Sequence, residues 1–145
     1  MKLSTRTRYG TRALLELALR ETEGESPVFL KDIAKSQELS LPYLEHLIAP
    51  LVSGGIIRST KGPKGGIALT KRPEDINMKE IAYLLEGSLA PVDCVDCAET
   101  CDRSTLCVTR EIWGQMKDAM DNVLECTTLK NLVENQKKKQ ITPAA

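Results

Sequence analysis

The sequence predicts a mainly α-helical protein with one short β-hairpin. Three stretches within the first 53 residues carry apolar side chains at helical spacing, and a further helical pattern starts at Thr105. Two short β-like runs, residues 56–59 and 66–69, are separated by a basic segment that contains glycine and proline, as in a hairpin. The 145 residues suffice for one ordinary domain, or for a small domain with an interaction arm.

The helices of the first half are bounded by recognisable residues. Apolar spacing places the first two at residues 5–20 and 30–36, where arginines and lysines surround the apolar positions. Ser40 is a suitable N-cap for the third helix, because its hydroxyl can accept a hydrogen bond from a free backbone N–H. We expect this helix to bend or tighten at Pro50 without stopping there, and to end at Gly54.

Three helices followed by a hairpin with a basic tip form the outline of a winged helix-turn-helix domain, which we place at residues 1–72. These residues carry 12 Lys and Arg against 7 Asp and Glu, whereas residues 73–145 carry 8 against 13. A positively charged front half suits a polyanionic partner. The sequence therefore predicts a domain that binds double-stranded DNA.

Candidate DNA contacts lie at the start of the third helix, at the hairpin tip and on the first helix. Polar side chains on an exposed helix face can reach base edges, while lysines flanked by glycines can approach phosphates closely. A single basic residue more often solvates an ordinary surface, but this ordered combination favours DNA binding. The predicted contacts are Arg6, Arg8, Ser40, Tyr43, Glu45, His46, Arg58, Lys61, Gly62, Lys64 and Gly65. We expect Tyr9, in contrast, to lie in the core.

The second half divides into a connecting helix with a cysteine-rich loop, a long helix with a short final helix, and a disordered tail, at residues 73–104, 105–136 and 137–145. Asn77 followed by Glu80 resembles a capping box for the connecting helix. The long helix repeats apolar residues at intervals of seven, which predicts a packing seam.

Four cysteines fall within fourteen residues as C-x2-C-x3-C-x5-C, at Cys94, Cys97, Cys101 and Cys107. Thiolates bind iron–sulfur clusters, zinc and copper(I), and closely spaced cysteines on one loop can converge on such a group. Disulfides are the structural alternative, but the polar N-terminus shows no signal peptide and predicts a cytoplasmic protein, where disulfides rarely persist. The lone histidine is distant in sequence, and Cys126 is interpreted as a buried or bystander thiol.

Several motifs together resemble one known family. They are Met1-Lys2-Leu3-Ser4, Arg8-Tyr9-Gly10, Leu39-Ser40-Leu41-Pro42-Tyr43-Leu44-Glu45, Lys61-Gly62-Pro63-Lys64-Gly65-Gly66, and Glu86-Gly87 before the cysteines. They closely resemble the Rrf2 family, to which the bacterial iron–sulfur cluster regulator IscR belongs, and the likeness runs to about Asn135. The resemblance implies a homodimer in which the long helix, from about Thr105 to Leu124, crosses its partner. Two winged domains would then read the half-sites of a pseudo-palindromic operator.

The resemblance also implies a cluster in the cysteine loop. The IscR pattern is C-x5-C-x5-C with a histidine three residues after the last cysteine. Cys101 and Cys107 match the second interval, the first ligand is Cys94 or Cys97, and Arg110 stands at the histidine position. A protonated guanidinium cannot ligate iron. We therefore expect an all-cysteine ligand set, and a [2Fe–2S] rather than a [4Fe–4S] cluster.

These observations favour a transcription regulator whose operator binding depends on an iron–sulfur cluster. One alternative keeps DNA binding and replaces the cluster by thiol oxidation or by a partner protein. Another is a zinc-stabilised interaction module, because four cysteines satisfy tetrahedral zinc. An enzyme is not expected, since the sequence offers no nucleophile–base pair, and no apolar run approaches the length of a membrane span.

Overall fold

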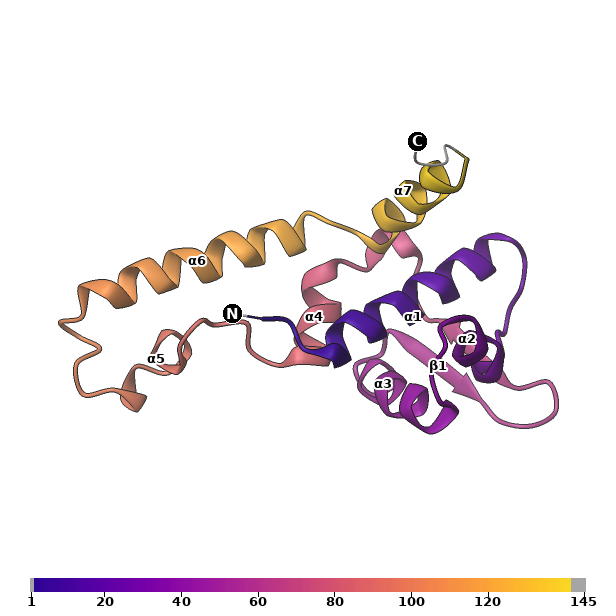
Figure 1. Cartoon of the computed structure of the whole chain (residues 1–145), viewed down its shortest axis with the longest axis horizontal. Coiled ribbons are helices and arrows are strands. Elements are labelled where there is room, and N and C mark those ends of the chain that lie inside the picture. The colour runs from indigo at the N-terminus through magenta and orange to yellow at the C-terminus, as the bar shows by residue number, and fades with distance from the viewer. Residues whose placement is uncertain (1, 142–145) are drawn as a thin grey trace.

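A body of helices and one hairpin carries a long arm in the computed structural model, which describes residues 2–141 (Figure 1). The body contains α1 (Thr5–Thr22), α2 (Leu30–Ser36), α3 (Leu41–Ser53), β1 (Ile57–Thr60), β2 (Gly66–Leu69), α4 (Met78–Glu86) and α7 (Leu129–Ile141). The arm contains the short α5 (Asp93–Asp96), a 3-10 turn at Ala98–Thr100 and the long α6 (Val108–Glu125). The mainly helical winged helix-turn-helix architecture predicted from the sequence is confirmed.

The helices start where their capping residues predict. Ser4, Ser40 and Asn77 each precede a helix in extended conformation, and each side chain accepts a hydrogen bond from a backbone N–H in the first turn. Only half of the predicted capping box before α4 is formed, because the Glu80 carboxylate instead pairs with Lys71 at 3.0 Å. An ion pair to a residue nine positions earlier thus replaces a local hydrogen bond to the backbone.

Helix α3 continues through Pro50 and ends at Ser53, as the sequence predicts. Proline removes one backbone donor, but its position in the last turn leaves few helical bonds to lose. The Pro50 carbonyl still accepts a bond from Gly54 N–H at 2.9 Å. The helix therefore tolerates this proline at its end.

The hairpin is antiparallel, with Ile57 opposite Leu69 and Thr60 opposite Gly66. Its first strand lies one residue later than the predicted run. Val28 and Ile67 exchange two backbone hydrogen bonds of 2.9 and 2.8 Å, which attach the hairpin to the segment before α2. This attachment fixes the direction in which the wing projects from the body.

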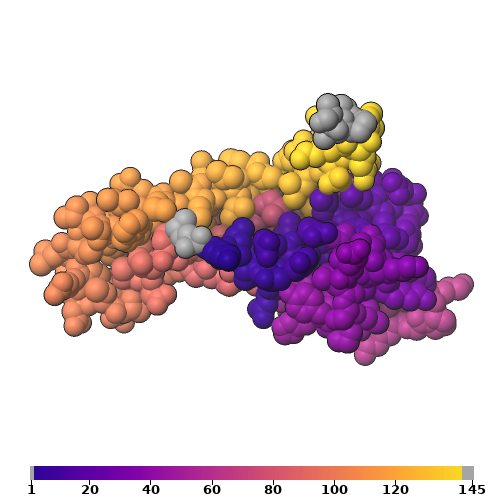
Figure 2. Space-filling model, viewed as in Figure 1, coloured from indigo at the N-terminus to yellow at the C-terminus, as the bar shows by residue number. Residues whose placement is uncertain are grey.

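The core lies in the body, between α1 and the elements around it. Its largest side chains are less than 2% exposed and are Leu14, Leu17, Ile33, Leu44, Leu47, Leu51, Ile56, Ile57, Ile67, Ile76, Ile81 and Leu85. Helix α7 adds Leu129 and Val133, although it follows the arm in sequence. Figure 2 shows that the chain leaves the body for the arm and returns to it. Helix α6 has no buried residue.

In the second half of the chain, two boundaries differ from those predicted by three or more residues. Helix α6 begins at Val108 and not at Thr105, because residues before it form turns and Leu106 is 90% exposed. Helix α7 continues to Ile141, so residues 137–141 are helical where the sequence predicted disorder. Lysine and glutamine are good helix formers, and lysines near a helix C-terminus interact favourably with its dipole. The rest of the predicted tail, residues 142–145, lies outside the described residues.

None of the helices within residues 2–141 combines the length and the apolar character needed to cross a bilayer.

The close contact between α1 and α4 depends on Gly10. A Cβ atom at this position would lie 2.8 Å from Leu85 Cδ1, and both residues are buried. Gly10→Val should therefore lower the free energy of unfolding by about 1–3 kcal/mol through overpacking. Thermal or urea unfolding measures this loss. In the Leu85→Ala background the same change should cost less, and strictly additive losses would show that this contact is not the cause.

Candidate nucleic-acid interface and cysteine loop

The predicted base-reading residues lie on the exposed side of α3. Ser40, Glu45 and His46 are exposed and Tyr43 is half-buried, so their polar atoms face solvent while Leu44 and its apolar neighbours face the core. Figure 1 shows that α3 lies at the lower edge of the body, on the side opposite α7. An α-helix presented in this way can enter the major groove.

The wing tip presents two lysines. Lys61 and Lys64 are exposed on the loop between β1 and β2, and Arg58 is exposed on β1. Gly62 has a φ of +105°, a backbone conformation that favours glycine. Gly65 does not fit its predicted role, because it is buried and its N–H donates to the Gly62 carbonyl at 2.9 Å. Gly65 therefore stabilises the turn of the wing tip and is not exposed for contact with DNA.

The structure places Tyr9 differently from the core position that the sequence predicts. Tyr9 is half-buried and its ring packs edge-on against Tyr43, with centroids 6.5 Å apart. One turn earlier on α1, Arg6 lies with Nη2 3.3 Å from Nε2 of His46. The helical spacing of Arg6 and Tyr9 is visible in the sequence, but the approach of α3 to that face is not.

The cysteine loop connects α4 to α6. Cys94 and Cys107 are half-buried, Cys97 and Cys101 are exposed, and all four are free thiols. Across residues 2–141, no three His, Cys, Asp or Glu side chains are grouped closely enough to hold a metal ion. The loop therefore supplies four soft donors in one segment, while their predicted convergence stays a prediction. His46 belongs to α3 and not to this loop.

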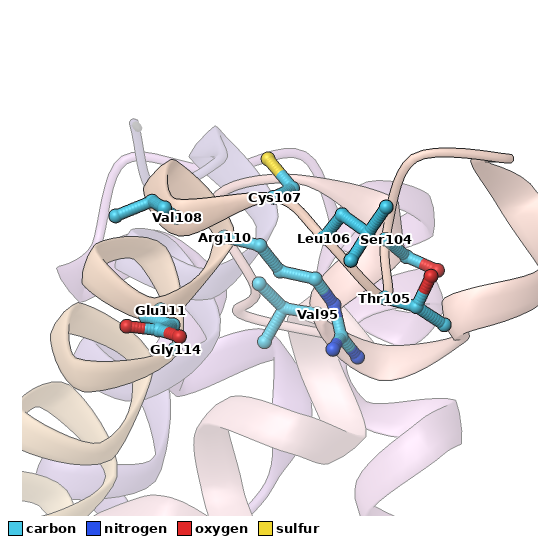
Figure 3. A pocket seen from close by; sticks show the side chains of 9 residues that line it. All are labelled: Val95, Ser104, Thr105, Leu106, Cys107, Val108, Arg110, Glu111 and Gly114. Carbon is cyan, nitrogen blue, oxygen red and sulfur yellow. The ribbon is translucent and has the colours of Figure 1, made fainter.

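Arg110 ties the loop to the start of α6. Its Nε donates to the Cys94 carbonyl at 2.7 Å. Its side chain lines a hollow of about 400 Å³ together with Val95, Cys107 and other residues of the loop. Figure 3 shows the guanidinium beside Val95, while the sulfur of Cys107 points to the opposite side. A residue that the sequence excludes as a ligand thus holds the backbone of one candidate ligand.

Polar contacts hold the cysteine loop to α6, and α6 to α4. Asp96, between Cys94 and Cys97, lies 3.1 Å from Lys117 Nζ on α6 and accepts a hydrogen bond from Ser88. The Ser88 and Lys117 contacts lower the pKa of Asp96. Tyr83 of α4 donates to Asp121 of α6 at 2.8 Å, and burial followed by this bond raises the pKa of Tyr83.

Cys107 occupies the N-cap position of α6. Its Sγ lies 3.1 Å from the Thr109 hydroxyl. This contact, together with the backbone N–H of Arg110, lowers the pKa of the Cys107 thiol. A thiol stabilised as thiolate is both a better metal ligand and a better nucleophile. The geometry therefore suits either of the two chemistries proposed from the sequence.

Glu86 connects the last turn of α4 to the first turn of α1. Its carboxylate accepts bonds from Ser4 N–H at 3.1 Å, from the Ser4 hydroxyl at 2.8 Å and from the Thr7 hydroxyl. The Thr7 contact is the main cause of a lowered pKa of Glu86; burial opposes it, and the two Ser4 contacts lower the pKa further. The cysteine loop starts at the next residue.

An apolar groove of about 690 Å³ runs between α1, α4 and α6, lined by Leu3, Thr7, Arg8, Thr11, Arg12, Met78, Ala82, Leu89, Ala119, Met120, Val123 and Leu124. Val123 is 66% exposed and Ile112, further along α6, is 51% exposed. The predicted seam of α6 is thus only partly covered by its own chain.

Comparisons with known proteins agree with this geometry. The Rrf2 family, described as an iron-dependent transcriptional regulator, matches residues 3–135. The protein named rrf2 from Nitratidesulfovibrio vulgaris is 44% identical over 135 residues, which cover 93% of this chain and 89% of the relative.

Two solved structures have the same fold. The structure of CymR, titled the global cysteine regulator of B. subtilis, is 37% identical, with a TM-score of 0.75 over 93% of this chain and 98% of that one. The structure of T. potens IscR is 36% identical, with a TM-score of 0.75 over 100% of this chain and 93% of that one.

The contacts of Glu86 predict a pH-dependent contribution to stability. Glu86→Gln should lower the free energy of unfolding near neutral pH by about 1 kcal/mol, since hydrogen bonds to a half-exposed carboxylate are partly screened by solvent. A lowered folded-state pKa stabilises the protein above the ordinary glutamate pKa of about 4.3. The difference between the two proteins should therefore vanish as the pH falls through that lower folded-state pKa.

Urea unfolding of both proteins between neutral and acidic pH measures this difference. Glu99→Gln, in the exposed part of the loop, is the matched control and should unfold like the wild type. A pH-independent difference would contradict the assignment.

Proposed function

Because the chain belongs to the Rrf2 family of transcriptional regulators, we propose that an iron–sulfur cluster in its cysteine loop controls its binding to an operator. The observation that carries this proposal is the position of the loop. Four free thiols lie on the only segment that joins α4 of the DNA-binding body to α6. The family description as iron-dependent supports iron as the metal.

The proposed ligands are Cys94, Cys97, Cys101 and Cys107. Four thiolates match the ligand requirement of a [2Fe–2S] cluster in number and in softness, so the donor set fits the group. Arg110 cannot ligate iron, and its bond to the Cys94 carbonyl gives it a supporting role. When bound, such a cluster supplies a site that responds to oxidants and to iron supply. The loop residues supply the thiolates and their positions.

The contacts of the loop give the route to the DNA-binding surface. Asp96 binds Lys117 on α6 and Ser88 beside the end of α4. Glu86, two residues before Ser88, holds the first turn of α1, and Arg6 of that turn lies against His46. A change in the order of the loop is therefore transmitted through polar contacts to the recognition helix. Such a route acts by shifting the populations of two conformations that differ in the position of the DNA-binding body.

The operator-binding form is proposed to be a cytoplasmic homodimer. Helix α6 has no buried residue, and its apolar side chains Ile112 and Val123 are exposed. The apolar groove between α1, α4 and α6 lies beside the C-terminal part of this helix. A second copy of α6 crossing this region would cover the exposed apolar side chains of α6. Two-fold symmetry would then present two α3 helices to the half-sites of a pseudo-palindromic duplex.

A cluster-free regulator controlled by thiol oxidation is the second candidate. In the described residues no three His, Cys, Asp or Glu side chains are grouped for a metal ion, and Cys107 has a lowered pKa, as reactive thiols do. In this case the loop would respond to an oxidant by joining two thiols, with the same contacts to α4 and α6.

Iron and acid-labile sulfide separate the candidates. Protein purified anaerobically should contain iron and sulfide in equal amounts and show visible charge-transfer absorption. Cys107→Ala should lose most of both, because one of four ligands is removed. Cys126→Ala, an exposed cysteine outside the loop, is the matched control and should keep the full content. Full iron and sulfide in Cys107→Ala would refute the ligand assignment, and colourless wild-type protein that resists reconstitution would favour thiol control.

The DNA-binding surfaces predict two different kinds of loss. Lys64→Ala should weaken binding to every duplex and lower the salt slope by about 1 per bound protomer, since a phosphate contact is lost. Tyr43→Ala should also relax base preference, by about 1–3 kcal/mol at the contacted position. Binding assays over a range of salt concentrations, with selected and unrelated duplexes, measure both effects. Equal and salt-independent binding by the two variants would contradict the assigned surfaces.

A further inference from the structure

Helix α1 runs along α3 and touches it at two successive levels. Arg6 lies 3.3 Å from His46, and Tyr9 packs edge-on against Tyr43 with an interplanar angle of 79°. Tyr9 follows Arg6 by three residues on α1, and His46 follows Tyr43 by three residues on α3. The two contacts are therefore about one helical turn apart. Because the order is reversed between the helices, α1 and α3 are antiparallel here, and Tyr9 lies at the N-terminal turn of α3.

Two arginines accompany the ring of Tyr9. The guanidinium carbons of Arg8 and Arg12 lie 5.9 and 5.5 Å from the ring centroid, within the range of a cation–π contact. Both side chains are exposed. Like charges four residues apart on a helix repel each other by about 0.2–0.5 kcal/mol. The structure therefore holds two cations together beside Tyr9 at some cost.

The natural partner of Arg12 is already engaged. Glu16 follows Arg12 at the i+4 position, but its Oε1 binds Arg20 at 2.8 Å and its Oε2 accepts a bond from Gln37 at 2.6 Å. Within the described chain neither Arg8 nor Arg12 forms an ion pair, whereas Arg20 and Arg72 each form two. The two guanidiniums thus keep their hydrogen-bond donors free for an external anion.

We propose that α1 contributes two further residues to the DNA interface, beyond the contacts Arg6 and Arg8 predicted from the sequence. Arg12 is a phosphate contact, and Tyr9 is a positioning residue that holds Tyr43 against the bases. The proposal rests on the proposed DNA binding and is independent of the cluster. It follows from the position of these side chains, because the phosphate backbone flanks a groove that receives the N-terminal turn of a recognition helix. Arginine matches phosphate oxygens with two parallel donors.

The first test is the salt dependence of Arg12→Gln. Its probes are a 30-base-pair duplex enriched from random sequence by the wild-type protein and an unrelated duplex of equal length. Arg12→Gln should bind both duplexes several-fold more weakly, and its salt slope should fall by about 0.9 per bound protomer. Lys130→Gln removes an exposed cation of α7 and should leave both quantities unchanged.

The second test concerns Tyr9. Tyr9→Leu should reduce the preference for the enriched duplex several-fold with an unchanged salt slope, whereas Tyr9→Phe, which retains the ring, should behave like the wild type. In the Tyr43→Ala background, Tyr9→Leu should add little, because its effect passes through Tyr43. Circular dichroism and thermal unfolding of each variant establish that it is folded.

The outcomes divide clearly. An unchanged salt slope in Arg12→Gln overturns the phosphate contact. The positioning role is overturned if Tyr9→Leu leaves the preference for the enriched duplex unchanged, or lowers it as much in the Tyr43→Ala background as in the wild type. In both cases DNA binding by the wild-type protein upholds the proposed function. Wild-type protein that enriches no duplex and binds neither probe overturns both. If the same losses are measured in protein without iron, the inference stands even where the cluster assignment fails.

Discussion

The carboxylate of Glu86 is the contact on which the rest of the arrangement depends. It ends α4 and accepts hydrogen bonds from Ser4 and Thr7 at the start of α1, so it joins residues 82 positions apart in the chain. A carboxylate is favoured near a helix N-terminus, where free N–H groups and the helix dipole stabilise negative charge. The cysteine loop leaves the body immediately after this contact. Glu86 thus fixes the end of the loop that faces the DNA-binding body.

The body and the arm are held by different forces. Close-packed leucine and isoleucine side chains fill the body, whereas α6 lies on α4 through Tyr83–Asp121 and an ion pair from Lys79 to Glu125 at 3.5 Å. Exposed ion pairs contribute little to stability on their own. The arm therefore depends on further burial for a fixed position, which a second copy would provide on the proposed dimer. Its position is then open to influence from the loop.

Local signals in the sequence were sufficient for most of the body. Ser40 and Asn77 cap their helices as predicted, and α3 passes Pro50, because capping and proline effects involve only neighbouring residues. Contacts between distant segments were not predictable from one sequence. The bond from Arg110 to Cys94, like the packing of Tyr9 on Tyr43, depends on how elements meet in space. The burial of Gly65 was missed for a related reason, since a glycine-rich tip is equally consistent with exposed and buried glycines.

The two proposed forms of control make the same demand on the loop. A signal can shift the position of the recognition helices only by as much as it interacts differently with the two states of the protein. In the described conformation, Arg110 and Lys117 hold the segment around Cys94 against α6, while the thiol of Cys107 points away from the Arg110 guanidinium. On either proposed chemistry, a change at the Cys94 or Cys107 sulfur acts on a segment that these contacts tie to α6. Arg110 and Lys117 would then pass this change to α6, and Arg110 would take part in the proposed control without being a ligand.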